Sequence, residues 1–101
     1  MKRYRVGYEP EARADLDDIY TWIAREGGVQ IADGFIFRLR TFCDGLEHSP
    51  LRVPIRNDLK LGVRMVAFEK SVTVAFLVSG DRVDIVRFLY RGRNLTDAFT
   101  S

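Results

Sequence analysis

The residue types best suited to chemistry gather near the end of the chain. Arg87, Tyr90, Arg91 and Arg93 lie within seven positions of one another, and Arg64 stands near the start of an earlier apolar run. A guanidinium binds a phosphate or a carboxylate through two parallel hydrogen bonds, and a tyrosine beside it can transfer a proton or stack on a base. Solvated arginines paired with nearby aspartates are an equally ordinary interpretation. The residue types alone leave both open.

Other candidates for metal or nucleophilic chemistry are isolated. His48 is the only histidine, and Cys43 is the only cysteine, so no internal disulfide and no cysteine-based metal site is expected. Asp15, Asp17 and Asp18 share a predicted helix but spread around its axis, and we interpret them as a solvated acidic face. We expect no metal and no cofactor.

Composition and charge favour a small globular domain. Of the 101 residues, 47% are hydrophobic and 30% are charged, which predicts a single domain over residues 1–101. The longest apolar run, residues 72–78, is far shorter than the roughly 20 residues of a membrane helix, and no secretory signal is recognisable. We therefore expect a cytoplasmic protein with no membrane contact. Residues 1–50 carry a net charge of −2 and residues 51–101 carry +4, which suits either nucleic acid or an acidic partner.

Hydrophobic periodicity predicts the elements that position these residues. Apolar residues three and four apart predict one helix that opens at Pro10 and ends at Gly27-Gly28, and a second over 29–46. Alternation with a period of two predicts strands over 4–8, 63–68, 72–78 and 83–89, with a turn at Gly80-Asp81. The predicted fold is α+β with the order β-α-α-β-β-β. An N-terminal strand and an antiparallel helical hairpin pack on one face of a three-stranded antiparallel meander.

The predicted meander is apolar on both faces, although two helices can cover only one. We expect the uncovered face to bind a partner, because exposed apolar surface of this kind usually marks an interaction site. The alternative is a lid formed by the N-terminal stretch and the loop over 50–60. The side chains assigned to the uncovered face are Val66, Phe68, Ala75, Leu77, Val86, Phe88 and Tyr90.

Motifs along nearly the whole chain carry a family resemblance. They are YEPEARADLDDIY at 8–20 with WIA at 22–24, ADGF at 32–35 followed by Leu39 and Leu46, SP at 49–50, GVR at 62–64, and VDIVRFLYRGRNL at 83–95. Together they resemble the ParE-type toxins of the RelE/ParE superfamily, whose fold is a helical hairpin on an antiparallel sheet. The resemblance implies the toxin of a type II toxin–antitoxin system, neutralised by a ParD-like antitoxin that covers the apolar face.

The superfamily has two main activities, and one departure separates them here. RelE-like members cleave mRNA with a basic cluster, whereas ParE-like members inhibit DNA gyrase. Where the nuclease branch has an arginine–aromatic pair, this chain has Ser71-Val72, with only Lys70 nearby. Cleavage needs general acid–base groups and stabilisation of charge on the phosphate. We therefore expect a gyrase inhibitor that is not an enzyme.

Two alternatives remain open. A ribosome-dependent mRNA endonuclease would have to use the cluster Arg64, Lys70, Arg87, Tyr90, Arg91 and Arg93. A degenerate toxin would keep antitoxin binding and lack a target. Under the gyrase interpretation, Arg87, Arg91 and Arg93 contact the target protein, and no direct sequence-specific nucleic-acid binding by the toxin alone is expected.

Overall fold

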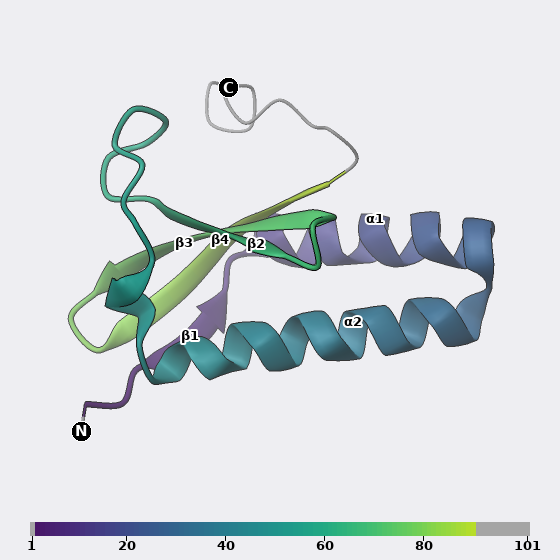
Figure 1. Ribbon diagram of the computed structural model, residues 1–101, viewed down its shortest axis with the longest axis horizontal. Coiled ribbons are helices and arrows are strands. Elements are labelled where there is room, and N and C mark those ends of the chain that lie inside the picture. Colours follow the sequence, from purple (N-terminus) through teal and green to yellow (C-terminus); the bar gives the residue numbers. More distant parts are fainter. Residues whose placement is uncertain (1, 91–101) are drawn as a thin grey trace.

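The computed structural model describes residues 2–90 and confirms the predicted order of elements (Figure 1). Two 3-10 turns, η1 (Gly45–Glu47) and η2 (Pro50–Arg52), follow the helices. The helices and strands are β1 (Arg5–Tyr8), α1 (Pro10–Gly27), α2 (Val29–Asp44), β2 (Arg64–Phe68), β3 (Val72–Ser79) and β4 (Arg82–Tyr90).

The four strands form one sheet in the order β1-β4-β3-β2. The three C-terminal strands are the predicted antiparallel meander, and β1 adds to its β4 edge in parallel, with Val6 opposite Val83. The sequence did not indicate where β1 pairs. Because β1 is only four residues long, it covers the first part of β4 and ends where Tyr8 pairs with Ile85.

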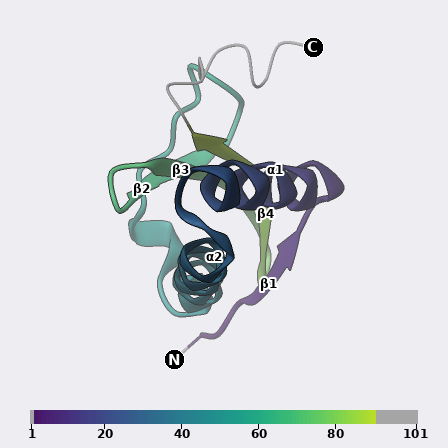
Figure 2. The ribbon, with the colours of Figure 1, turned by 90° about the vertical axis from the view of Figure 1, so that its right-hand side faces the viewer.

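The helical hairpin turns at glycine and packs beneath the sheet. Gly28 joins α1 to α2 with φ 98°, a conformation that side-chain-bearing residues rarely adopt. In Figure 2, α1 lies at the height of β3 and α2 lies below it. Leu16 and Ile19 of α1 and Leu39 of α2 are buried in one cluster with the facing side chains of β3 and β4. Full burial of such a side chain contributes about 1.5–3 kcal/mol, so this cluster holds the layers together.

A β-bulge in β4 reverses which side chains face the core. Ala75 pairs with Arg87 but Phe76 pairs with Ile85, so Val86 has no partner across the ladder. A single extra residue shifts the alternation by one position, and the side chains beyond it change face. Phe88 and Tyr90 therefore join Ile85 in the core cluster. The assignment of Phe88 and Tyr90 to the uncovered face was wrong, because regular alternation was assumed through the bulge.

The same correction applies to β2. Val66 pairs with Val74 and Phe68 pairs with Val72, two residues of the core face of β3. The ring of Phe68 lies 5.7 Å from that of Phe35 and Val66 packs against the core cluster, so both point toward the helices. The register of β2 against β3 decides which side chains of β2 face the helices, and the residue types alone did not determine that register.

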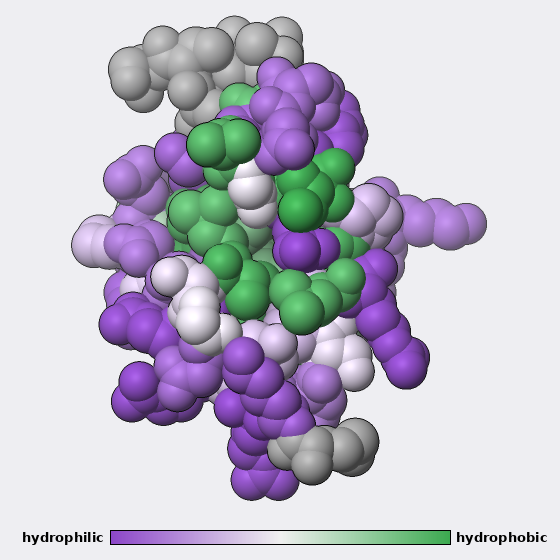
Figure 3. All heavy atoms as spheres, turned by 90° about the vertical axis from the view of Figure 1, so that its left-hand side faces the viewer, coloured by the Kyte–Doolittle hydropathy of each residue, from purple (hydrophilic) through white to green (hydrophobic). Residues whose placement is uncertain are grey.

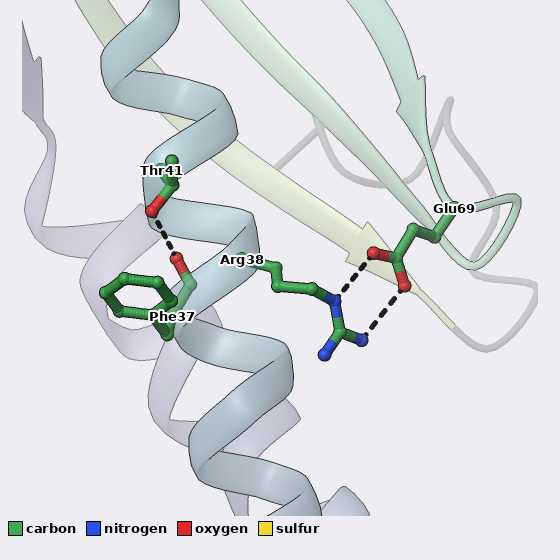
Figure 4. Close-up of polar contacts among 4 residues, drawn as sticks. All are labelled: Phe37, Arg38, Thr41 and Glu69. Carbon is green, nitrogen blue, oxygen red and sulfur yellow. Dashed lines mark hydrogen bonds and ion pairs between the residues drawn. The ribbon is translucent and has the colours of Figure 1, made fainter.

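Two tight turns connect the meander. Gly80 forms the predicted β3–β4 turn with φ 61°. The β2–β3 turn places two non-glycine residues in the left-handed region, Glu69 at φ 48° and Lys70 at φ 60°. Arg38 of α2 holds this turn through a two-point contact, with its Nε and Nη2 donating to the Glu69 carboxylate at 2.8 and 3.1 Å (Figure 4). The hydrogen bonds from Arg38 lower the pKa of Glu69, and the contact ties the helix to the turn.

Candidate functional site

The C-terminal half of β4 is fixed by one acidic side chain of α1. Asp15 accepts hydrogen bonds from Arg87, Nε at 2.7 Å and Nη2 at 3.1 Å, and from the backbone N–H of Phe88 at 2.9 Å. Among residues 2–90, no strand pairs with this edge of β4 beyond Ile85, so Asp15 supplies the acceptor that β1 does not reach. An unpaired buried N–H would cost about 1–3 kcal/mol.

This contact corrects the interpretation of Asp15 and changes that of Arg87. Asp15 is 4% exposed, not part of a solvated acidic face, whereas Asp17 and Asp18 are exposed as expected. The side chain of Arg87 is 17% exposed, and its hydrogen bond to Asp15 raises the guanidinium pKa. Arg87 thus holds the strand end against α1. The sequence interpretation took Asp15 as lying off the apolar stripe, but it stands three residues after Ala12 and four before Ile19, which is the spacing of the buried face. That spacing was the available signal for this role.

The tyrosine at the strand end is also inside the structure. Tyr90 is buried, and its ring stacks on Trp22 of α1 with centroids 5.8 Å apart. The predicted partners Arg91 and Arg93 lie outside the described residues. Tyr90 therefore packs between the sheet and α1 instead of standing on the surface.

The other two basic residues of the candidate nuclease cluster lie at opposite ends of β2. Arg64 begins the strand, and its Nη1 donates to the backbone carbonyls of Val53 at 2.6 Å and Leu51 at 3.3 Å. Lys70 lies in the turn that follows the strand. Arg64 pairs across the ladder with Phe76, whereas Arg87 pairs with Ala75, one residue along β3 and so on the opposite face. The structure does not bring these described residues into one cluster.

Three of the seven side chains assigned to the uncovered face lie outside the core cluster: Ala75, Leu77 and Val86. Leu77 and Val86 are half-buried, and Ala75 is buried. The loop that was the alternative lid forms a bridge beside β2, where Ile55 pairs with Arg64.

A half-buried tyrosine at the end of β1 was not anticipated from the sequence to take part in a polar contact. The hydroxyl of Tyr8 donates to Asp44 Oδ1 at 3.0 Å, and the guanidinium of Arg40 lies 5.0 Å from the tyrosine ring. Burial, with Cys43 and Asp44 nearby, raises the pKa of Tyr8 well above its ordinary value. Burial likewise raises the pKa of the Cys43 thiol to about 12. Neither group supplies an anionic nucleophile at neutral pH.

The described part of the chain holds neither a metal-binding cluster nor a membrane-spanning helix. Among residues 2–90, no three His, Cys, Asp or Glu side chains are grouped to hold a metal ion. No helix in the same range has both the length and the apolar composition needed to cross a bilayer.

Comparison with known proteins identifies the family. The model of the ParE toxin of the type II toxin–antitoxin system parDE matches residues 6–95. Toxin ParE1 of Caulobacter vibrioides is 35% identical over 95 residues, which cover 93% of this chain and 94% of that protein. The chain belongs to the ParE toxin family, as its motifs indicated.

Solved structures share the fold. A chain of the chromosomal ParDE system from P. aeruginosa superposes with a TM-score of 0.78 at 22% identity, covering 89% of this chain and 98% of that one. A chain of the RelBE2 toxin–antitoxin complex from Mycobacterium tuberculosis gives 0.65 at 23% identity, covering 92% and 97%. At these identities the two likenesses concern the fold alone.

Proposed function

We propose that this chain is a toxin that acts in the cytoplasm by inhibiting DNA gyrase and is neutralised by a ParD-like antitoxin. The observation that carries the proposal is the family match over residues 6–95. The ParE branch of the superfamily inhibits its target by binding and needs no cleavage chemistry of its own.

The geometry at the end of β4 supports binding over RNA cleavage. A phosphate-cleaving site needs a guanidinium directed at the substrate and a proton-transfer group within hydrogen-bonding reach. Arg87 is engaged by Asp15, and Tyr90 is stacked against Trp22. A mRNA endonuclease therefore remains the less supported candidate, and a non-enzymatic toxin is the proposal.

The proposal assigns two surfaces. The antitoxin lies on the outer face of the sheet, over the half-buried Leu77 and Val86, because these apolar side chains stand apart from the core cluster. Ala75 shares this face but is fully buried beneath its neighbours. Arg91 and Arg93 contact the target, and Arg87 fixes the strand from which they extend.

Controlled expression in bacteria tests the toxin–antitoxin assignment. Induction of this chain should arrest growth, and co-expression of a short neighbouring gene with a ribbon-helix-helix pattern should restore it. The matched control is the same neighbour lacking its C-terminal half, which should fail to restore growth. Unimpaired growth at a verified level of the folded chain would contradict the proposal and favour the degenerate toxin.

A further inference from the structure

A hollow beside α1 has an aromatic floor at the point where β4 ends. Its volume is about 450 Å³, far more than the roughly 30 Å³ of one water molecule. Trp22 and Tyr90 line it with their stacked rings, and Tyr90 is the last described residue of β4. In Figure 1 the end of β4 lies above α1. Residues 91–101 therefore follow directly from a residue that lines the hollow.

Two carboxylates flank the tryptophan. Asp18 and Glu26 lie four positions before and after Trp22, which places each of them one helical turn, about 6 Å, from it along the same side of α1. Both residues line the hollow and both are exposed. Among residues 2–90, neither carboxylate forms an ion pair. The rim also carries Arg25, so its net charge is negative.

An aromatic ring between two carboxylates suits a guanidinium group. A planar guanidinium stacks on an indole ring by cation–π attraction, and its N–H donors bind carboxylates on either side. Nothing in this chemistry favours an anion or a purely apolar group. Figure 3 shows apolar side chains gathered at the end of the molecule remote from the α1–α2 connection. The hollow extends toward that connection, since Glu26 lies two residues before Gly28.

The chain itself supplies two guanidinium groups within reach. Arg91 and Arg93 follow Tyr90 by one and three positions. Three residues of extended chain span at most about 11 Å, which exceeds the one helical turn between Trp22 and either carboxylate. Gly92, between the two arginines, allows the backbone to turn toward the helix. Charge complementarity and the place where β4 ends therefore select the same occupant.

We propose that the hollow is the docking site of the chain's own segment over residues 91–93. One guanidinium stacks on Trp22, and the two arginines pair with Asp18 and Glu26. This contact ties the segment that follows β4 to α1. The docking is an interaction within the chain and does not rest on the proposed function.

Docking has a consequence for the target, and this consequence does rest on the proposed function. Arg91 and Arg93 are the residues assigned above to the target, and in the docked chain α1 engages their guanidinium groups. Binding to the target then requires release of the segment, so the apparent affinity falls by the fraction of chains that are released. A variant that frees the segment should inhibit gyrase at an about threefold lower concentration than wild type.

Fluorescence of Trp22 tests the docking directly, because it is the only tryptophan of the chain. Quenching by acrylamide measures access to the ring, and acrylamide is neutral, so nearby charge does not bias the result. Asp18→Asn combined with Glu26→Gln should raise the Stern–Volmer constant about twofold, since the stacked guanidinium loses its carboxylates. Arg91→Gln combined with Arg93→Gln should raise it equally.

Matched variants and a double-mutant cycle complete the experiment. Glu11→Gln combined with Asp17→Asn changes exposed carboxylates of α1 that do not line the hollow, and Arg3→Gln combined with Arg5→Gln changes two exposed arginines. Neither pair should change the quenching. The two hollow variants joined in one chain should exceed neither alone, because both remove the same contact. Circular dichroism and thermal melts confirm the fold of each variant, and each hollow variant tests the docking without the other.

The contrary results are specific. Quenching unchanged in a folded hollow variant, an equal rise in the control pairs, or additive effects in the joined variant would each overturn the docking. Wild-type quenching that rises on dilution would assign the guanidinium to a second copy and overturn it as well. If the hollow variants expose Trp22 but no form of the chain inhibits gyrase, the docking stands and the proposed function fails.

Discussion

Asp15 and Arg87 lie 72 positions apart in the sequence, and the Asp15 carboxylate accepts a hydrogen bond from Arg87 Nε at 2.7 Å. The same carboxylate oxygen accepts the N–H of Phe88, just after the bulge at Val86. The strand end, its register and the position of α1 are thus determined together. Arg87 therefore stabilises the fold by holding the end of β4 against α1. Tyr90, the last described residue of the strand, is held there as well by its contact with Trp22.

Removing this carboxylate should be strongly destabilising. Asp15→Ala leaves Arg87 and the Phe88 N–H without their shared acceptor in a mostly buried site, at a cost of about 3 kcal/mol or more. Chemical denaturation measures the change in unfolding free energy. Asp17→Ala on the exposed side of the same helix is the control and should lie within about 0.5 kcal/mol of wild type. Equal stability of the two variants would show that the Asp15 contact does not hold the fold.

Replacing Arg87 should act on stability before it acts on a target. Arg87→Ala leaves the buried Asp15 carboxylate with only part of its hydrogen bonding and should cost about 2 kcal/mol, whereas Arg3→Ala at an exposed arginine should cost almost nothing. Denaturation curves and toxicity are measured together. Loss of toxicity in Arg87→Ala at unchanged stability would contradict this and return Arg87 to the target surface.

The β2–β3 turn offers a stabilising substitution. Lys70 has φ 60°, so Lys70→Gly should relieve left-handed strain and raise the unfolding free energy by about 0.5–1 kcal/mol. Glu69→Gly relieves similar strain but removes the Arg38 contact, so its gain should be smaller. Thermal melts compare the two. A larger gain for Glu69→Gly would mean that the ion pair contributes nothing.

Cys43 should report on the integrity of the core. Its pKa of about 12 keeps the thiol protonated in the folded chain at pH 9, where the unfolded thiol is largely ionised. The unfolded chain thus releases a proton from about pH 8.5 upward and the folded chain does not, so this group lowers stability as pH rises toward 12. Iodoacetamide at pH 9 should label Cys43 only at denaturant concentrations that unfold the chain. Rapid labelling of the native chain would contradict its burial.

The sequence predicted what local signals determine and missed what tertiary contacts determine. The helix ends at Gly27-Gly28 and the turn at Gly80 follow from backbone preferences, and the element order follows from periodicity. The faces of β2 and β4 depend on pairing register and on the bulge at Val86. In β4 the bulge coincides with a change of phase in the apolar positions, from 83 and 85 to 88 and 90, which was interpreted as two apolar faces.

The candidate site shows the same limit. Asp15 looked like its exposed neighbours because its partners lie 72 and 73 positions away. Arg87 and Tyr90 were found as notable residues, but their types could not show that one pairs with Asp15 and the other stacks on Trp22. Leu51 and Leu61 lie in a segment that the sequence indicated only as a loop, so their exposure was not anticipated.

Gyrase supercoiling, assayed beside translation in vitro, tests the central claim most directly. The wild-type chain should inhibit supercoiling and leave translation intact. Arg91→Ala combined with Arg93→Ala should lose inhibition without loss of fold, and Tyr90→Phe should retain it. The contrary result is specific: cleavage of ribosome-bound mRNA that Tyr90→Phe abolishes, with supercoiling unaffected throughout.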